Sequence, residues 1–360
     1  MVESVPLDTD AHDRRGARER AERRRVIRQR LIALVLAAAT LVAIVLVTPS
    51  SPPAPTLLTA SGSGPGHLAA GSPGALPAKI LIADRGNNRL VVITPRGQVA
   101  WSTKTLAPTD VYLGPHKDSI AVTQRGAFVV LTLDVASGAL EYVYGKAGQP
   151  GAAYNRLRNP QAAHLIAKGR LVVADDANCR VLVLAPPSTR PAEVLGQAGE
   201  CAHDPPSRLS YPDAIFPTLG GRYVVTESTG WIDLLTSGFA LFRALPVHRF
   251  SDPFDANEYA AGKLIVTSRS YVGAVEELST TGAVLWRYGP ASGPGRLRDP
   301  SLAQGLPDGD VLVCDSGNDR IVVIDRQTKA IVWQYGHTGV PGSRPGYLDA
   351  PDSATLVPSS

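Results

Sequence analysis

The sequence predicts an all-β protein: a six-bladed β-propeller closed by its C-terminal strand and preceded by one N-terminal transmembrane helix. A short strand rich in Val and Ile recurs six times at steps of roughly 40 to 52 residues, the repeat length of four-stranded blades. The 360-residue chain also contains 34 Gly and 30 Pro, as expected for a β protein with many turns. One charge-free apolar segment near the N-terminus predicts the helix.

One repeat unit is clearest between residues 310 and 336. Three apolar runs, at 311–314, 321–324 and 330–335, are separated by short polar turns. The runs are too short for helices, and their Val and Ile side chains suit the packed surface of a sheet. One such meander cannot bury both of its faces alone, so the repeated units must pack against one another.

Counting the repeats predicts how the ring closes. The second strand of each unit is expected at 80–84, 119–123, 171–175, 223–227, 264–268 and 311–315. A second series consists of prolines, at Pro108, Pro160, Pro212, Pro253, Pro300 and Pro351. The last proline has no second strand after it, so the two series match only if it belongs with the first strand. We therefore predict that residues 353–357 form the innermost strand of the blade built on 80–84, which leaves no long free edge.

The N-terminal segment predicts a membrane anchor. Residues 1–30 contain nine arginines and six acidic residues, so they carry 9 − 6 = +3 of the formal net charge of +4. Residues 31–47 are apolar, and no charged residue follows them until Lys79. The positive-inside rule then places the arginine-rich head in the cytoplasm and the rest of the chain outside, on a single-pass anchor in the cell membrane. The alternative is a cleaved signal peptide, with an unusually long basic region and a poor cleavage site.

The remaining chain divides into a linker and a folded domain. Residues 48–78 contain no charge and are rich in Pro, Gly and Ser, so we expect a disordered linker there and the propeller at 79–360. The chain after residue 30 carries only 4 − 3 = +1. This balance does not predict a nucleic-acid partner, because phosphate binding needs a concentrated basic patch.

The turns after three of the predicted second strands share a motif. Asp84 is followed by RGNNR, Asp175 by DANCR and Asp315 by SGNDR. Together with the aromatic-Gly…Pro linkers between the units, these turns resemble the NHL repeat, from Lys79 to the C-terminus. The Gly-x-x-x-Trp segments at 97–101 and 282–286 more weakly resemble quinoprotein-like propellers, and residues 271–289 resemble arylsulfotransferase-type propellers. The resemblance implies a β-propeller and no particular reaction.

Each of these motifs pairs an aspartate with an arginine five residues later. The pairs are Asp84 with Arg89, Asp175 with Arg180, and Asp315 with Arg320. We interpret them as structural braces across the turn, because catalytic groups converge on one place whereas these are spread around a ring. In the other three repeats we expect Thr123, Thr226 and Thr267 to replace the aspartate.

Two of the three cysteines are expected to form a disulfide. Cys179 lies in the turn after a predicted second strand, and Cys201 lies in the linker that leaves the same blade. Those two connections open on the same rim of a four-stranded blade, and the oxidising compartment implied by the anchor lets them bond. Cys314, inside an apolar strand, is expected to be a buried free thiol.

Catalytic motifs are missing from the sequence. It contains no G-x-S-x-G elbow, no H-E-x-x-H, no C-x-x-C and no P-loop, so we expect no catalytic residue, metal or cofactor. His203, His248 and His337 fall in predicted linkers between blades, and hence on one rim. They are candidates for a metal or acid–base role, with solvent-exposed loop histidines as the alternative.

Three functions remain, of which the absence of a catalytic signature favours the first. It is an extracytoplasmic binding module, a scaffold or sensor for a protein, peptide or glycan ligand. The second is a propeller enzyme, arylsulfotransferase-, lactonase- or lyase-like, with ionisable groups of shifted pKa converging on the mouth of the central channel. The third is a quinone-binding protein with an open channel mouth.

Overall fold

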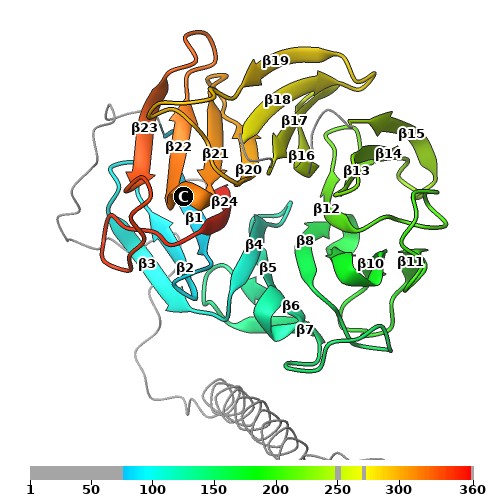
Figure 1. Cartoon of the computed structure of the whole chain (residues 1–360). Helices are drawn as coiled ribbons and strands as arrows, with labels where there is room; N and C mark the ends of the chain where they lie inside the picture. Colours follow the sequence, from blue (N-terminus) through cyan, green and yellow to red (C-terminus); the bar gives the residue numbers. More distant parts are fainter. Residues whose placement is uncertain (1–75, 248–252, 270–272, 358–360) are drawn as a thin grey trace, which may run out of the picture. The chain divides into compact units, whose positions relative to one another are not determined.

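The computed structural model describes residues 76–247, 253–269 and 273–357, which form six four-stranded antiparallel sheets. Figure 1 shows these sheets arranged as blades around a central axis. The predicted six-bladed propeller is therefore confirmed. The head at 1–30, the predicted anchor at 31–47 and most of the predicted linker lie outside the described residues. Within the described ranges, no helix is long and apolar enough to cross a membrane.

Each blade runs outward from the axis through four strands. Blade 1 consists of β24, β1, β2 and β3, and blades 2 to 6 take the next strands in groups of four, from β4 to β23. The inner strands are β24 (Pro351–Val357), β4 (Pro108–Leu113), β8 (Pro160–Ile166), β12 (Pro212–Pro217), β16 (Pro253–Ala260) and β20 (Pro300–Gly305). The second strands are β1 (Lys79–Asp84), β5 (Ser119–Gln124), β9 (Arg170–Asp175), β13 (Tyr223–Glu227), β17 (Lys263–Ser268) and β21 (Val311–Asp315).

The two outer positions complete the blades. The third strands are β2 (Arg89–Ile93), β6 (Val129–Asp134), β10 (Arg180–Leu184), β14 (Trp231–Leu235), β18 (Ala274–Ser279) and β22 (Arg320–Ile324). The outermost strands are β3 (Val99–Lys104), β7 (Leu140–Gly145), β11 (Glu193–Gly196), β15 (Leu241–Pro246), β19 (Val284–Tyr288) and β23 (Ile331–Gly336). Burial follows this order: β10 and β22 are buried along their whole length, whereas at least half of the residues of β7 and of β19 are exposed.

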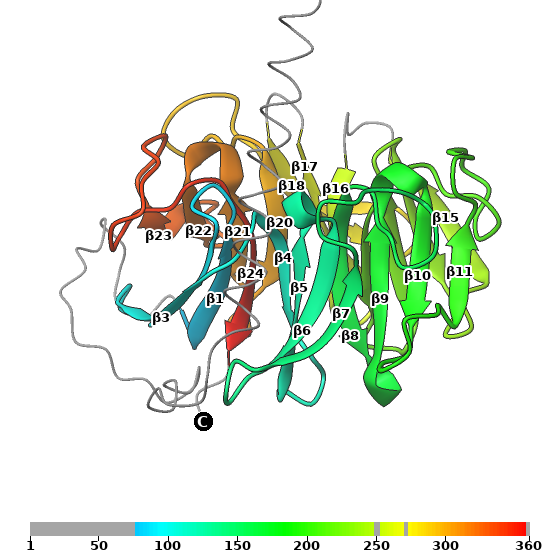
Figure 2. The same cartoon turned by 90° about the horizontal axis from the view of Figure 1, so that it is seen from below.

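The ring closes as the sequence predicts. Strand β24 pairs antiparallel with β1, with Ile80 opposite Leu356 and Ile82 opposite Ala354. In Figure 2 the red β24 lies between the blue β1 and β4, so the end of the chain completes the blade begun at its start. Leu76, just before β1, is also buried in the core, so the packed domain begins slightly before the predicted boundary.

All six inner strands begin with the same irregularity. The proline pairs with the last residue of the second strand, and the next pair involves the residue two positions on, as in Pro108 with Gln124 and then Asp110 with Thr123. The same shift occurs after Pro160, Pro212, Pro253, Pro300 and Pro351. A bulge leaves one residue unpaired and redirects its side chain. The six bulged residues therefore do not follow the alternation of the strand.

Candidate functional site

The bulged residues line one end of the central channel. They are Thr109, Gln161, Asp213, Phe254, Ser301 and Asp352, and all six contribute to one cavity of about 20 Å³. We call this end of the channel, where the inner strands begin, the proline mouth. A cavity of this volume has room for a water molecule or one small chemical group. The channel is therefore narrow between the six bulged residues of the proline mouth.

A second set of side chains comes from the turns at the same rim, at the position that directly follows each second strand. By the register of the six sheets, these residues are Arg85, Arg125, Asp176, Ser228, Arg269 and Ser316. Three of them are arginines, from blades 1, 2 and 5, and each is half-buried. The propeller thus brings together three cations that are far apart in sequence.

Two of these arginines contact carboxylates of the mouth. Arg85 Nε donates a hydrogen bond to Asp352, whose side chain is 1% exposed. The Arg269 guanidinium lies 3.2 Å from the centre of the Phe254 ring, 3.0 Å from Asp299 and 4.0 Å from Asp352. Burial raises the pKa of Asp352, and the charges of Arg85 and Arg269 oppose that rise. The charge of the buried Asp352 carboxylate is thus partly compensated by two arginines.

Arg125 differs from the other two, because among the described residues it contacts no carboxylate. Its Nε donates to Asn159 Oδ1, and the amide of Asn159 donates in turn to Asp176. Burial and the neighbouring cations Arg269 and Arg85 lower the pKa of Arg125, and the nearby carboxylates of Asp352 and Asp176 oppose this fall. Like charges held this close repel one another, so an anion between them would be stabilised.

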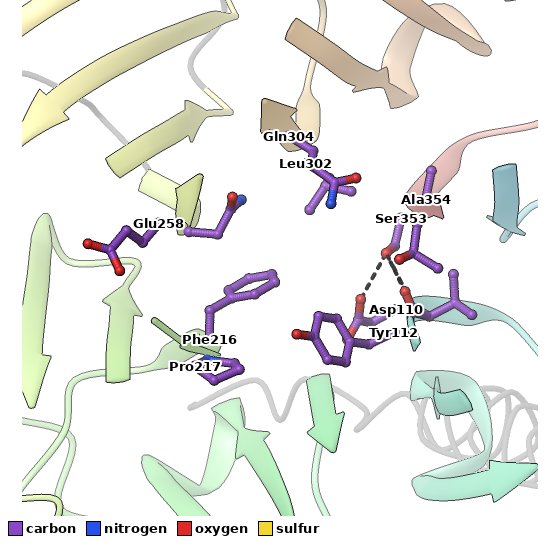
Figure 3. Close-up of a pocket in the computed structure, with 12 residues that line it drawn as sticks. Asp110, Tyr112, Phe216, Pro217, Glu258, Leu302, Gln304, Ser353 and Ala354 are labelled. Atoms are coloured by element: carbon purple, nitrogen blue, oxygen red, sulfur yellow. Dashed lines mark hydrogen bonds between the residues drawn. The ribbon is translucent and has the colours of Figure 1, made fainter. Parts of the chain in front are cut away.

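The channel also contains a larger cavity of about 100 Å³, further along the inner strands. Figure 3 shows its lining, with Asp110, Tyr112, Phe216, Glu258 and Gln304 contributed by four blades. The lining mixes aromatic rings with carboxyl and amide groups. The cavity is therefore polar enough to hold water or a small polar ligand.

The larger cavity is lined by Ser353 and Asp110, and these two residues do not form a catalytic triad with the buried His164. Ser353 Oγ donates to Asp110 Oδ1 at 2.8 Å, and His164 Nε2 lies 3.1 Å from Asp110 Oδ2. The aspartate therefore stands between the other two, whereas a nucleophilic serine needs the histidine beside it. The other nitrogen of His164 contacts the carbonyl of Ile215. These contacts join blades 1 to 4 at the channel wall.

The three predicted turn braces have the same geometry in blades 1, 3 and 6. Arg89, Arg180 and Arg320 place Nε at 2.6, 2.7 and 2.8 Å from Asp84, Asp175 and Asp315, respectively. Each aspartate also accepts a backbone N–H from the preceding linker and a side-chain amide from the turn, as Asp175 does from Arg158 and Asn178. Every brace thus supplies three donors to one buried carboxylate.

The other three blades depart from the prediction. The register places Gln124, Glu227 and Ser268 opposite the inner-strand prolines, where the braced blades have aspartate. The expected Thr123, Thr226 and Thr267 lie one residue earlier, so that alignment was wrong. The error arose because each strand ends in two polar residues, and the first was aligned with the aspartate. Blade 4 therefore has an acidic residue, Glu227, at the brace position.

The candidate rim histidines lie in different surroundings. His203 Nδ1 is 2.9 Å from Glu227 Oε2 and 3.8 Å from Asp233 Oδ2, and its ring stacks on Trp231 at 3.9 Å. His337 stacks on Tyr347 at 4.1 Å in another linker. The group of potential metal ligands formed within the described ranges contains His203 but not His337. His248 lies outside the described residues.

The cysteines form the predicted bond. Cys179 and Cys201 are joined by a disulfide with a Cα–Cα distance of 5.2 Å, and Cys314 is a buried free thiol. The disulfide ties the linker between blades 3 and 4 to the turn after β9. Because His203 follows Cys201 by two residues, the same bond fixes the part of the linker that carries His203.

Sequence reasoning missed the proline mouth as a site. The six bulged residues follow the prolines directly, but nothing in the sequence shows that they leave the alternation of the strand. The three mouth arginines could have been found by aligning the residue after each second strand. That alignment required the register at Gln124 and Ser268, where our prediction was off by one residue.

The fold and the proline mouth together define a six-bladed β-propeller with a charged opening at one end of its channel.

Searches with known protein-family models found no match, and no curated protein matches the sequence. Several solved structures share the fold. A protein of unknown function from Bacteroides caccae has a TM-score of 0.55 at 16% identity, over 78% of this chain and 98% of that one. A streptogramin B lyase has a TM-score of 0.52 at 15% identity, over 72% and 79%. Virginiamycin B lyase from Staphylococcus aureus has a TM-score of 0.52 at 12% identity, over 76% and 84%. At these identities the likeness concerns the fold alone.

Proposed function

We propose that the protein is a membrane-tethered extracytoplasmic binding module whose proline mouth binds an anionic group of its ligand. The observation that carries this proposal is the convergence of Arg85, Arg125 and Arg269 from three blades. A carboxylate, sulfate or phosphate on a peptide, protein or glycan has the charge and the acceptor oxygens that guanidinium groups recognise. Because the cavity below is small, the ligand would insert only its anionic group and lie across the rim.

Arg125 is the best candidate for direct contact with the ligand. Arg85 and Arg269 already contact Asp352 and Asp299, so part of their charge is compensated. Within the described part of the chain Arg125 donates to a neutral amide, and it is repelled by Arg269 and Arg85 as well as attracted by Asp352 and Asp176. An incoming anion would relieve this repulsion and accept hydrogen bonds from the terminal nitrogens of Arg125.

The proposed location follows from the sequence and is supported by the disulfide. Residues 31–47 would anchor the chain, with residues 1–30 in the cytoplasm. A stable disulfide such as Cys179–Cys201 is typical of proteins outside the cytoplasm. The linker at 48–78 would hold the propeller away from the membrane surface, where its mouth can meet a ligand.

Binding measurements with a matched pair of variants test the proposal. The full chain is titrated with a panel of probes (inorganic sulfate, inorganic phosphate, acidic peptides and uronic-acid oligosaccharides) by calorimetry. For a probe that binds, Arg125→Gln removes charge-assisted hydrogen bonds of about 1.5–3 kcal/mol and so weakens binding about 10- to 100-fold. Arg96→Gln changes an exposed arginine between β2 and β3 and serves as the control. Equal affinity of the two variants, or no binding of any probe, would contradict the proposal.

The second candidate function is a propeller enzyme acting at the same mouth. It is favoured by the convergence of ionisable groups from several blades, including Asp352 with its raised pKa. Each carboxylate of the mouth whose contacts are described above is already engaged by an arginine or an amide, which favours binding over catalysis. Turnover of a bound probe that is lost in Arg125→Gln and retained in Arg96→Gln would shift the assignment to the enzyme.

A further inference from the structure

Blade 4 contains a buried acidic pair that lacks the arginine of the other braces. Glu227 occupies the brace position at the end of β13, and Asp233 lies two residues into β14. Both side chains are completely buried. The position of the brace arginine, opposite Glu227, is taken by Trp231, which has no positive charge.

The pair also has few hydrogen-bond donors. Each braced aspartate accepts three hydrogen bonds, as Asp315 does from Arg298, Asn318 and Arg320. In blade 4 the described donors to this pair are His203 and the backbone N–H of Ser210, and both serve Glu227. Both oxygens of Asp233 and Oε1 of Glu227 have no hydrogen-bond partner among the described residues. Two buried carboxylates with so few donors are stabilised either by a proton that they share or by a bound cation.

Asp233 stands where four of the other five blades have an aliphatic residue, while blade 5 has Glu276. The third residue of the equivalent strand is Val91 in blade 1, Leu182 in blade 3 and Val322 in blade 6. An aliphatic side chain is therefore compatible with this position of a blade. The carboxylate of Asp233 is thus not required for the fold of a blade.

We propose that His203, Glu227 and Asp233 bind a divalent transition-metal ion of the zinc class. One imidazole and two carboxylates are ligands that zinc accepts in proteins. Bonds of about 2.0–2.2 Å place tetrahedral ligand atoms about 3.4 Å apart, so that one coordination position remains for water or a ligand. Here His203 Nδ1 is 2.9 Å from Glu227 Oε2 and 3.8 Å from Asp233 Oδ2, and all three ligand atoms lie within 4.8 Å of one another.

Two features outside the ligand set hold the histidine in place. The Trp231 ring is nearly parallel to the imidazole, at an interplanar angle of 6°, and so fixes the orientation of Nδ1. The Cys179–Cys201 disulfide anchors the linker just before His203. With 19% of its side chain exposed, His203 lies between the buried carboxylates and solvent, which gives an ion a path to them.

Zinc binding by the full chain tests this site. Protein stripped with a chelator is mixed with ZnCl₂ and desalted, and its bound metal is measured by mass spectrometry. We expect one zinc per chain in the wild type and in His337→Ala, a rim histidine without acidic ligands beside it. His203→Ala and Asp233→Leu should each weaken zinc binding by more than about 100-fold, because each removes a direct ligand. Zinc should raise the thermal midpoint of the wild type but not of these two variants.

Three results would contradict the proposed zinc site. If the two carboxylates only share a proton, the wild type binds no zinc and its thermal midpoint does not respond. Zinc retained by His203→Ala would place the ion elsewhere and overturn the proposal. Cobalt substitution of the wild type adds a test that does not depend on any variant folding. Tetrahedral cobalt absorbs visible light strongly, and the absence of that spectrum would also contradict the site.

Discussion

Removing one brace arginine should cost more stability than removing the whole charged pair. Arg320 is 2% exposed and donates from Nε to Asp315 at 2.8 Å, while its other nitrogens contact Gln334, Thr338 and two backbone carbonyls. Arg320→Met keeps the length of the side chain but leaves Asp315 buried without a cation. Breaking such a buried pair from one side typically costs about 3–5 kcal/mol.

A double variant that removes both charges of the brace tests this prediction. In Asp315→Asn with Arg320→Met the buried charge is gone, so we expect at least about 2 kcal/mol of the loss to be recovered. The free energy of unfolding is measured by urea titration of the full chain, with Arg96→Met as an exposed control expected to change it by less than about 0.5 kcal/mol. A loss below about 1 kcal/mol for Arg320→Met, or simple addition of the two single effects, would refute the reasoning.

Three further predictions concern the ring, its disulfide and its buried charges. A chain that ends at Ala350 lacks β24 and exposes the edge of β1, so it should lose cooperative unfolding and self-associate in gel filtration; a monomer with a wild-type urea midpoint would contradict the closure. Replacing both Cys179 and Cys201 by Ser should lower stability by roughly 3 kcal/mol for a loop of this length, and an unchanged thermal midpoint would speak against it. Burial and the charge of Asp110 raise the pKa of Asp255 well above its ordinary value, so the folded protein binds a proton that the unfolded chain releases. The stability from this proton is present at acid pH and is lost as the pH rises through the folded-state pKa. Asp255→Asn should therefore flatten the fall of the urea midpoint as the pH rises above the ordinary pKa of an aspartate, and an identical slope in both proteins would exclude this cause.

The fold could be predicted from the sequence because its strands, turns and closure depend on local patterns that repeat. Six prolines and six apolar strands were enough to assign Pro351 and the residues after it to the first blade. The disulfide followed from the placement of Cys179 and Cys201 on one rim.

The sites could not be predicted in the same way, because they depend on register. A shift of one residue hid Glu227 as the brace acid of blade 4, and so hid its relation to Asp233 and His203. The bulges that direct Thr109 and Asp352 into the mouth are set by pairing between strands, which no single segment reveals. The candidate histidines were chosen because they fall in predicted linkers, and of the two that lie within the described residues only His203 has acidic side chains beside it.

The central functional claim is that the proline mouth binds anions through its arginines. The most direct measurement is anomalous diffraction from crystals of the protein soaked in sodium bromide. Bromide should occupy a site within hydrogen-bonding distance of the Arg125 guanidinium and near Arg269, and the peak should disappear in Arg125→Gln. A mouth without bromide, in crystals that bind it at other arginines, would contradict the account.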